Sequence, residues 1–464
     1  MNVVITGATG FIGHRLVRRL QGQGHAVTAW TRDPERAAIS LPARCAVARW
    51  EPGACDPARL RGVDVAVHLA GENVAGGRWT EARKRAIRTS RIDSTRALVG
   101  AMRALPESAR PSALVCASAI GFYGDRGEET LDESSAPGSG FLADVCRDWE
   151  NEAFAAEALG IRAVAVRIGV VLGPDGGALA AMLPLFRLGV AGRLGAGRQW
   201  MSWVHVDDVV GLFAFAVERA DVRGPLNGTA PTPVRNSDFT TALARAVHRP
   251  ALLPVPGFAL RVAAGEISDV LLASQKVEPT ATLRSGYSFA HPKLEGALAS
   301  IATDGERVLE REQLVRRPRD EVFAFFSDAK NLELITPDFL RFRITAMSTP
   351  RIGAGTLIDY RLNLHGIPVG WRTRIEEWSP PERFVDVQLR GPYASWHHTH
   401  EFESVPEGTI VRDRVRYRLP LGVVGELAGG SFVTRDVDRI FAHRHARVAE
   451  LLAPETATRL HAVR

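Results

Sequence analysis

The sequence predicts an α/β fold with a doubly wound parallel sheet, followed by a smaller α+β domain. Up to about residue 300, short apolar runs rich in β-branched residues alternate with amphipathic helical segments. Such runs are typical of strands buried on both faces of a parallel sheet. Beyond Asp304 and Gly305, strand-like segments alternate polar and apolar positions, as antiparallel strands do. The 464 residues suffice for both domains, and we place the boundary between residues 303 and 304.

The predicted elements follow the chain in this order. Strands of the first domain are expected at residues 3–6, 26–30, 63–69, 113–118 and 163–172, with helices at 12–20 and 80–102 among them. Residues 250–303 are expected to form a small C-terminal region of this domain. In the second domain a helix at 319–334 precedes strands at 356–364, 371–378, 384–389, 399–403 and 409–418, and a long helix at 436–452 follows.

Charge and composition exclude several classes of protein. The net charge is +6, but only four of the 58 basic residues are lysines, and the arginines are interleaved with 52 acidic residues rather than clustered. We therefore expect no nucleic-acid partner. No apolar stretch reaches the roughly 20 residues of a membrane span, and the N-terminus has no export signal, so we expect a cytoplasmic protein without a membrane span. The four cysteines form no CxxC pair and are expected to be free thiols.

A glycine-rich loop, GATGFIG at residues 7–13, follows the first predicted strand and opens the first predicted helix. Its glycines would allow a tight turn and close approach of the main chain to a pyrophosphate, which the helix N-terminus would face with free N–H groups. The pattern predicts a dinucleotide site; the alternative is a glycine turn that serves packing alone. The expected cofactor-binding residues of this loop are Gly7, Thr9, Gly10, Phe11, Ile12 and Gly13.

The end of the second predicted strand favours NADP over NAD. NAD sites place an acidic residue there to bind the ribose 2′-hydroxyl. Here the strand ends at Thr31 and Arg32, and no acid occurs before Asp33. A hydroxyl and a guanidinium suit a 2′-phosphate. The alternative for Arg32 is a solvated surface arginine.

Several further motifs occur in order along the first 300 residues. They are LAGENV at 69–74, SAIGFYG at 118–124, RIGVVLGPDGGAL at 167–179 and GRQWMSWVHVDD at 197–208. Together with the glycine loop they resemble the atypical, epimerase-like family of extended short-chain dehydrogenases/reductases, with its small C-terminal region. The resemblance implies a Rossmann-type domain and cofactor contacts from Leu69, Ala70, Arg91 and Val171. For Leu69 and Val171 the alternative is an ordinary core position.

The usual catalytic dyad of that superfamily, Tyr-x-x-x-Lys, is absent. No lysine lies between Lys84 and Lys276, and the helix that should carry the dyad begins at Phe141. The remaining catalytic candidates are Ser118, at the end of the strand predicted at 113–118, and Tyr123. A phenol without a lysine titrates near pH 10 and is a poor base, so Tyr123 is alternatively a structural residue.

Two acids and one loop complete the candidate residues of the first domain. Glu72 and Glu150 are alternative acids, each with a structural interpretation beside it. A polar and aromatic loop is expected to wall a substrate pocket, and its residues are Gln199, Trp200, Trp203 and His205.

Residues 316–340 (RRPRDEVFAFFSDAKNLELITPDFL) and 384–402 (FVDVQLRGPYASWHHTHEF) resemble the START/polyketide-cyclase-like superfamily, which has a helix-grip fold. The resemblance implies a cavity for an apolar ligand; the alternative is a fully packed core. Candidates for the wall are Trp371, Trp378 and Trp396, and candidate polar groups are His365, His398 and Arg390. Because His398 and His400 share one face of a strand while His397 points away, two ligands converge, with His365 as a conceivable third, and we expect no metal.

The sequence therefore predicts an NADP(H)-binding oxidoreductase or epimerase-like protein that acts on an unidentified small organic substrate, fused to a domain that binds an apolar ligand. Two alternatives stay open. One is a non-catalytic NADP(H)-dependent sensor or scaffold, which the missing dyad favours. The other is a lipid or isoprenoid carrier that acts through the second domain.

Overall fold

The computed structural model describes residues 1–301, 306–420 and 422–453. The chain divides into two compact units. The first comprises residues 1–37 and 45–303, and the second comprises residues 38–44 and 304–464. The predicted boundary between residues 303 and 304 lies outside the described residues. Each unit has its own sheet and its own core.

The first unit is built on a seven-stranded sheet in which every neighbouring pair of strands is parallel, in the order β11-β7-β5-β4-β1-β2-β3. This confirms the predicted α/β class. The strands are β1 Asn2–Thr6, β2 Ala26–Thr31, β3 Ala46–Arg49, β4 Val65–His68, β5 Ala113–Ala119, β7 Arg162–Ile168 and β11 Gly224–Gly228. The central strands β1, β4, β5 and β7 consist almost entirely of buried residues, which explains their continuous apolar sequences.

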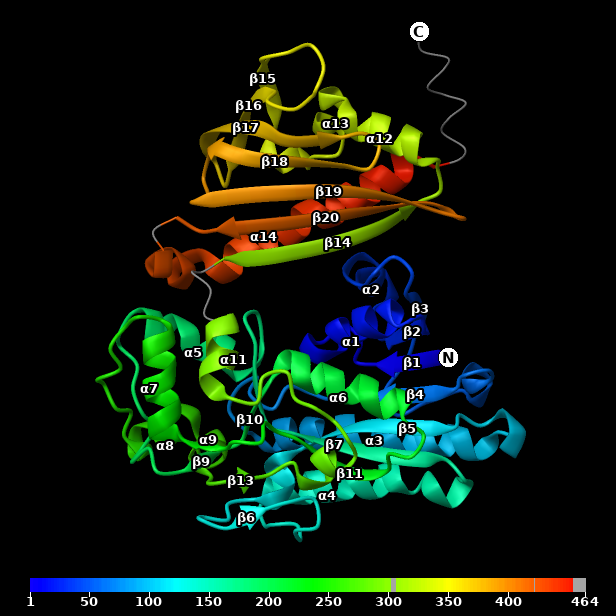
Figure 1. Ribbon diagram of the computed structural model, residues 1–464, viewed down its shortest axis with the longest axis vertical. Helices are drawn as coiled ribbons and strands as arrows, with labels where there is room; N and C mark the ends of the chain where they lie inside the picture. The colour runs from blue at the N-terminus through cyan, green and yellow to red at the C-terminus, as the bar shows by residue number, and fades with distance from the viewer. Residues whose placement is uncertain (302–305, 421, 454–464) are drawn as a thin grey trace. The chain divides into compact units, whose positions relative to one another are not determined.

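Helices cover both faces of this sheet, with α1 and α6 on one side and α3 and α4 on the other (Figure 1). Their bounds are α1 Phe11–Gly22, α3 Glu81–Ala104, α4 Phe141–Phe154 and α6 Val206–Glu218. The strand order reverses between β1 and β4, and in open α/β sheets ligands bind beyond the carboxyl ends of the strands at such a point. The glycine loop and Leu69 therefore lie where this fold places a ligand.

The region predicted as one strand at 163–172 is two strands. β7 ends at Ile168, and β8 Val170–Leu172 leaves the main sheet to pair with β10 Trp203–His205. Gly169 lies between the two strands. Only glycine fits there, because a Cβ would lie 2.5 Å from the Ser202 carbonyl oxygen. Continuous apolar character does not report such a change of partner.

The remaining elements of the first unit are shorter and lie mostly after β7. They are α2 Pro34–Ser40, β6 Thr130–Leu131, α5 Gly177–Arg187, β9 Trp200–Met201, β12 Val234–Arg235, α7 Asn236–Ala246, α8 Gly257–Ala264, α9 Ile267–Leu272, β13 Lys276–Val277, α10 Thr280–Arg284 and α11 Leu294–Ile301. Helices α5, α7 and α11 share a hydrophobic core that includes Trp203, Phe239 and Leu298.

The second unit has a seven-stranded antiparallel sheet in the order β14-β20-β19-β18-β17-β16-β15. Helix α14 lies along one face of it (Figure 1), which is the helix-grip arrangement and confirms the predicted α+β class. The strands are β14 Arg307–Val315, β15 Arg343–Met347, β16 Leu357–Leu364, β17 Ile367–Ser379, β18 Arg383–Arg390, β19 Ser395–Val405 and β20 Gly408–Arg418. The helices are α12 Arg319–Ser327, α13 Ala329–Leu334 and α14 Gly422–Leu451.

Four features of this unit differ from the prediction. Strand β15 was not predicted. Strand β14 precedes the helices and was not predicted either, because Glu310 and Glu312 interrupt its apolar pattern; each pairs with an arginine directly opposite on β20. The helix predicted at 319–334 is two helices, since Asp328 accepts the Lys330 N–H and caps α13. Helix α14 also begins well before residue 436.

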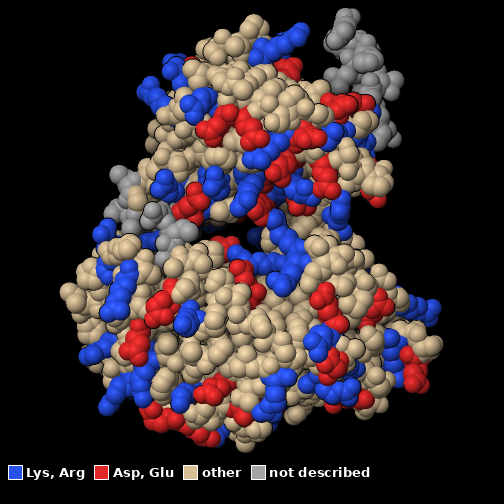
Figure 2. All heavy atoms as spheres, in the orientation of Figure 1, with Lys and Arg blue, Asp and Glu red and all other residues tan. Residues whose placement is uncertain are grey.

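Within the described part of the chain, no helix is both long enough and apolar enough to cross a membrane. Basic and acidic side chains occur side by side over the face of each unit that Figure 2 shows. This distribution agrees with the interleaved charges of the sequence.

Candidate functional site

The glycine loop lies against the end of β4. Gly7 has a φ of +70°, and a Cβ there would lie 2.7 Å from the main-chain carbon of Leu69. A Cβ at Gly13 would lie 2.2 Å from the Gly7 carbonyl oxygen. Only glycine fits at either position, so the loop forms a cradle without side chains. Thr9 and Gly10 are exposed at its tip.

Helix α1 presents its N-terminus at this cradle. Gly10 is its N-cap and provides no side-chain cap, and the first turn has no acidic residue. The first hydrogen bond within the helix runs from the His14 N–H to the Gly10 carbonyl, so the amides of Phe11, Ile12 and Gly13 precede it. Unpaired amides and the positive end of the helix dipole suit an anionic group such as a pyrophosphate.

A chain of hydrogen bonds fixes the segment that the loop touches. The Ala70 N–H donates to Thr6 Oγ1, which lies 2.7 Å from His68 Nδ1, and His68 Nε2 lies 3.0 Å from Ser94 Oγ. Ser94 Oγ in turn donates to the Ser90 carbonyl, so His68 accepts at Nδ1 and donates from Nε2 as a neutral imidazole. Leu69 and Ala70 follow β4 directly, rather than ending it as predicted.

His68 is fully buried, and burial, helped by the nearby charge of Arg91, lowers its pKa to about 4. His68 was not among the predicted site residues. A polar residue within an apolar strand, VAVH, was the available signal.

Arg91 lies beneath the turn that follows Ala70. A Cβ at Gly71 would lie 3.1 Å from its guanidinium carbon. Its Nη1 donates to the Ile87 carbonyl, and the guanidinium lies 5.3 Å from the centre of the Trp149 ring. Burial lowers the pKa of Arg91 from its ordinary value. The structure therefore places a partly desolvated positive charge beside the Leu69–Gly71 segment.

Phe11 and Val171 both lie close to the glycines of the loop that follows β8. A Cβ at Gly176 would lie 2.3 Å from the Phe11 ring, so this ring packs directly on the main chain of the loop. A Cβ at Gly177 would lie 2.4 Å from the Val171 carbonyl oxygen. Residues 173–177 (GPDGG) thus pack against both the start of α1 and β8.

Thr31 and Arg32 lie at the carboxyl end of β2, next to β1 in the sheet. Arg32 is exposed. The carboxylate of Asp33 accepts the Arg36 N–H at 3.0 Å, and its carbonyl accepts the Ala37 N–H, so Asp33 acts as the cap of α2. The first acidic residue after β2 is therefore used by the protein's own main chain.

Ser118 and Glu150 belong to a buried ion-pair network. Ser118 Oγ donates to Glu150 Oε1 at 2.6 Å. Arg167 binds both oxygens of Glu150, from Nε at 2.9 Å and from Nη2 at 2.8 Å, and the two side chains are each only 5% exposed. Such a bidentate pair orients the carboxylate and fixes the serine hydroxyl. Arg167 was not predicted, although a charge within the run AVAVRIG signals a paired buried residue.

Tyr123 joins the same network through Arg167. Its hydroxyl donates to Asn227 Oδ1 at 2.8 Å and accepts from Arg167 Nη1 at 2.9 Å. The residue has no exposed surface, and burial raises its pKa to about 12 although the charge of Arg167 opposes this. A neutral phenol with both roles occupied is suited to positioning Arg167 and Asn227. Ser118 and Tyr123 do not contact each other directly.

Apolar residues occupy the helix that would carry the dyad. Phe141 begins α4 and packs edge-on against Trp79, while Val145 and Cys146, one turn later, are buried. Lys84 Nζ lies 5.7 Å from the centre of the Phe141 ring, but this lysine is paired with Glu266 at 2.5 Å. The alternative acid Glu72 is half-buried and paired with Arg83 at 2.8 Å.

The loop expected to wall a substrate pocket divides into core and surface. Trp203 is fully buried in the core that α5 and α7 share, and Gln199 donates to the Leu194 carbonyl; for Trp203 the pocket interpretation is therefore wrong. Trp200 is half-buried between Arg235 and Lys276, whose charges lie 4.5 and 5.2 Å from its ring. Its Nε1 donates to Glu128.

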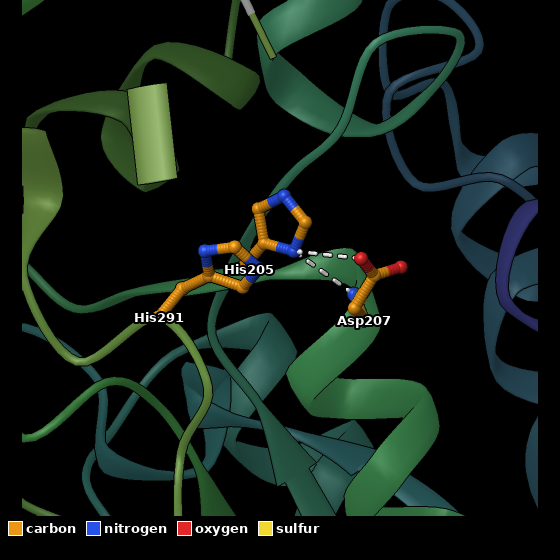
Figure 3. A group of neighbouring side chains, drawn as sticks. All are labelled: His205, Asp207 and His291. Atoms are coloured by element: carbon orange, nitrogen blue, oxygen red, sulfur yellow. Dashed lines mark hydrogen bonds and ion pairs between the residues drawn. The ribbon is translucent and has the colours of Figure 1, made fainter. Parts of the chain in front are cut away.

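His205 caps α6. Its Nδ1 accepts the Asp207 N–H, and its Nε2 lies 3.3 Å from Ser300 Oγ. The centre of its ring lies 3.9 Å from that of His291, with the two planes tilted by 34°. Figure 3 shows how His205, Asp207 and His291 lie. Burial, with the nearby His291, lowers the pKa of His205 to about 4. Both ring nitrogens are thus used inside the protein.

The second unit contains a mainly apolar cavity of about 210 Å³, smaller than the 300–1,000 Å³ typical of ligand pockets. Trp371, Trp396 and His398 line it, as predicted. Trp378 instead packs in the core beside Phe323 and Phe384. Neither Arg390 nor His365 lines the cavity; His365 Nε2 lies 2.7 Å from Asp436 instead.

Part of the lining of this cavity is polar. Asp386, His398, His400 and Arg444 line it, and Asp413 contacts both histidines; we call these five mostly buried side chains the polar cluster. Burial, with the nearby His400, lowers the pKa of His398 to about 4. For Asp413, burial acts to raise the pKa, but the charge of Arg444 and the histidine hydrogen bonds hold it well below its usual value.

Three family models match successive parts of the chain. Residues 3–227 match the family described as the NAD dependent epimerase/dehydratase family, residues 255–301 match a domain of unknown function, and residues 315–442 match the family described as polyketide cyclase/dehydrase and lipid transport. The last match and the fold support a ligand-binding role for the second unit.

Individual proteins are also similar to the first unit of this chain. The chloroplastic SDR39U1 homolog of Arabidopsis thaliana is 41% identical over 65% of this chain and 86% of its own length. The epimerase family protein YfhF of Bacillus subtilis is 39% identical over 66% of this chain and all of its own. The crystal structure of human SDR39U1 with NADPH covers 65% of this chain and 99% of its own, at 35% identity and a TM-score of 0.58.

Proposed function

The chain belongs to the NAD dependent epimerase/dehydratase family, and from this premise we propose that its first unit binds NADP(H) and catalyses oxidoreduction or epimerisation of a small organic substrate. The bound cofactor would supply hydride transfer at its nicotinamide ring. The residues of the first unit around the cofactor would bind the substrate, orient it and exclude water.

The choice of NADP(H) rests on the residues at the end of β2. Asp33 is engaged as the cap of α2, while Arg32 is exposed beside the Thr31 hydroxyl. A free guanidinium there suits a 2′-phosphate, and no free carboxylate is offered to a 2′-hydroxyl. The NADPH in the crystal structure of the human relative supports the same choice.

The residues around the glycine cradle fit the rest of the dinucleotide. The amides at the start of α1 would bind the pyrophosphate through the loop residues Gly7, Thr9, Gly10, Phe11, Ile12 and Gly13. Leu69 and Ala70 would line the adenosine side, with Arg91 providing positive charge beneath them. Val171, next to the Phe11 ring, would contact the nicotinamide end.

Within the buried network, Ser118 is the proposed catalytic residue. Its proton is directed at Glu150, so its oxygen lone pairs are free to accept a hydrogen bond from a substrate hydroxyl. We assign Tyr123 a positioning role, because its hydroxyl is fully buried and both of its hydrogen-bonding roles are filled.

The cofactor assignment is tested by measuring the dissociation constants of NADPH and NADH by calorimetry. Arg32→Ala should weaken NADPH binding at least about tenfold, since a hydrogen bond to a charged group contributes roughly 1.5–3 kcal/mol and 1.4 kcal/mol is tenfold. NADH binding should change less than about twofold, because NADH lacks the 2′-phosphate.

Arg103→Ala, an exposed arginine in the last turn of α3, is the matched control and should leave both constants unchanged. Equal loss of NADPH and NADH binding in Arg32→Ala would contradict the assignment. Consumption of NADPH with a metabolite extract then separates an enzyme from a sensor that binds without turnover.

A second function is favoured by the cavity of the second unit, which we propose binds an apolar ligand. Its wall includes Ile358, Leu362, Leu364, Trp371 and Trp396. Replacing a lining residue with a larger one, as in Leu364→Trp, should abolish binding of an environment-sensitive apolar dye by the full chain. Leu389→Trp, at a half-exposed position on β18, should leave dye binding unchanged. Equal dye binding in both variants would place the dye elsewhere.

A further inference from the structure

Two groups of histidine and acidic side chains in the described residues converge closely enough to hold a metal ion. The first is His205 with Asp207 and His291 (Figure 3). Both nitrogens of His205 are engaged, one by the Asp207 N–H and the other by Ser300. Asp207 is also largely exposed. The second group, Asp386 with His398 and His400, belongs to the polar cluster of the cavity. Its geometry favours a metal site.

Strand register brings this second group together. Asp386 on β18 is directly opposite His398 on β19, and His400 on β19 is directly opposite Asp413 on β20. Because side chains two residues apart point to the same face, all four converge on the cavity side of the sheet. His397 falls on the other face and does not line the cavity.

The distances within the group are those of ligands around one ion. Asp386 Oδ2 lies 2.9 Å from His400 Nε2 and 3.5 Å from His398 Nδ1. Ligand atoms bonded to a transition metal at about 2.0–2.2 Å are roughly 3.0–3.5 Å apart in octahedral or tetrahedral geometry. The three atoms need to move little to share an ion.

Asp413 is placed as an outer partner of both histidines. Its Oδ1 lies 2.8 Å from His398 Nε2 and 2.9 Å from His400 Nδ1, the nitrogens that face away from Asp386. Metal-bound histidines almost always donate their second N–H to such a carboxylate, which fixes tautomer and ring orientation. Arg444 Nη2 lies 3.5 Å from the same Asp413 oxygen and balances its charge.

We propose that Asp386, His398 and His400 bind one divalent transition-metal ion at the polar part of the cavity lining, with Asp413 orienting both histidines. Two histidines and one carboxylate leave coordination positions open for water or for an oxygen of a molecule in the cavity. The ion would act there as a Lewis acid. This site goes beyond the proposed binding of an apolar ligand and does not depend on it.

Binding requires one proton to move. Without metal, His400 Nε2 is in hydrogen-bond contact with Asp386, and Arg444 Nη2 lies 3.3 Å from His400 Nδ1. When the ion takes Nε2, the proton transfers to Nδ1, which already faces Asp413. The histidine stays neutral and no other group gains or loses a proton.

The test uses the full chain, stripped with a chelator and titrated with Co²⁺, followed by its visible d–d absorption and by elemental analysis with Zn²⁺. The wild type should bind one ion per chain with a d–d spectrum of nitrogen and oxygen ligands. Asp386→Asn and His400→Gln, which preserve size, should each weaken binding at least about 100-fold, and Asp413→Asn about 10–100-fold. His397→Gln, on the opposite face of the same strand, should bind as the wild type does.

Thermal unfolding keeps the test decisive. Zn²⁺ should raise the melting temperature of the wild type and His397→Gln, because an ion that binds only the folded state stabilises it, and should not raise that of Asp386→Asn or His400→Gln. If only one of these two variants folds without metal, its Co²⁺ binding and its melting temperature with Zn²⁺ are enough to test the site. A wild type without stoichiometric binding, or ligand variants that bind Co²⁺ as tightly as His397→Gln, would overturn the proposal.

Discussion

Polar residues within the apolar strands of the first unit hold its candidate site in place. Arg167 joins Glu150 to Tyr123, and His68 joins Thr6 to Ser94. A buried charge or imidazole is costly unless each of its hydrogen-bonding groups has a partner. These residues therefore fix the ends of β4, β5 and β7, where the cofactor and substrate would lie.

His68 gives a pH dependence that can be measured. Its pKa is lowered to about 4 in the folded protein against an ordinary value of 6.5. Between these values the unfolded chain binds a proton that the folded protein does not, so stability should fall as pH decreases from 6.5 to 4. The full effect is about 3 kcal/mol, since one pKa unit corresponds to 1.36 kcal/mol.

Urea unfolding of the wild type and His68→Gln at several pH values measures this effect. The variant lacks the titrating group, and its unfolding free energy should depend less on pH in this window. His248→Gln, at an exposed histidine that follows α7, controls for the loss of a histidine as such. The same slope in wild type and His68→Gln would show that His68 is not kept neutral by the fold.

At the scale of elements, the turn between β1 and α1 is the most constrained part of the candidate site. Gly7→Ala combines a positive φ with a Cβ 2.7 Å from the Leu69 main chain. A left-handed conformation alone costs a non-glycine residue about 1–2 kcal/mol. We expect the loop to shift and NADPH binding to weaken at least about tenfold.

Gly100→Ala provides the matched control. Gly100 lies within α3, and no atom approaches its Cβ position within 4 Å. The same substitution there should stabilise the protein by roughly 0.5–1 kcal/mol and leave NADPH binding unchanged. Unaltered binding in Gly7→Ala would mean that the cradle does not contact the cofactor.

The elements also show what the sequence could and could not predict. The glycine loop and the parallel sheet were predicted, because their requirements are local: residue type at adjacent positions and unbroken apolar runs. Strand β14 was not, since its charged residues are satisfied only by arginines of β20, about 100 residues away. Asp386 was not associated with His398 for the same reason, because only strand register places them opposite each other.

Trp203 illustrates a different limit. Its neighbours Gln199, Trp200 and His205 gave the loop the composition of a pocket wall, yet the indole fills the core that α5, α7 and α11 share. Composition reports the character of a segment, whereas the direction of a single side chain depends on the strand pairing of β10 with β8.

At the scale of the whole molecule, one chain combines two units with separate ligand chemistry. The first has a glycine cradle at the N-terminus of α1, where we propose that NADP(H) binds, and the second has a mainly apolar cavity with polar side chains in its lining. The relatives quoted above match about two thirds of the chain. The presence of both units in one chain implies related small-molecule ligands only by association, so each unit requires its own test.

Native mass spectrometry of the full chain, purified without denaturation and then supplied with an equimolar mixture of NADP(H) and NAD(H), would show which dinucleotide the first unit binds. We expect one dinucleotide per chain, identified after release as NADP(H), and a strongly reduced proportion of it in Arg32→Ala. One NAD(H) per chain, or no bound dinucleotide in the wild type at saturating concentration, would exclude the proposed NADP(H) site.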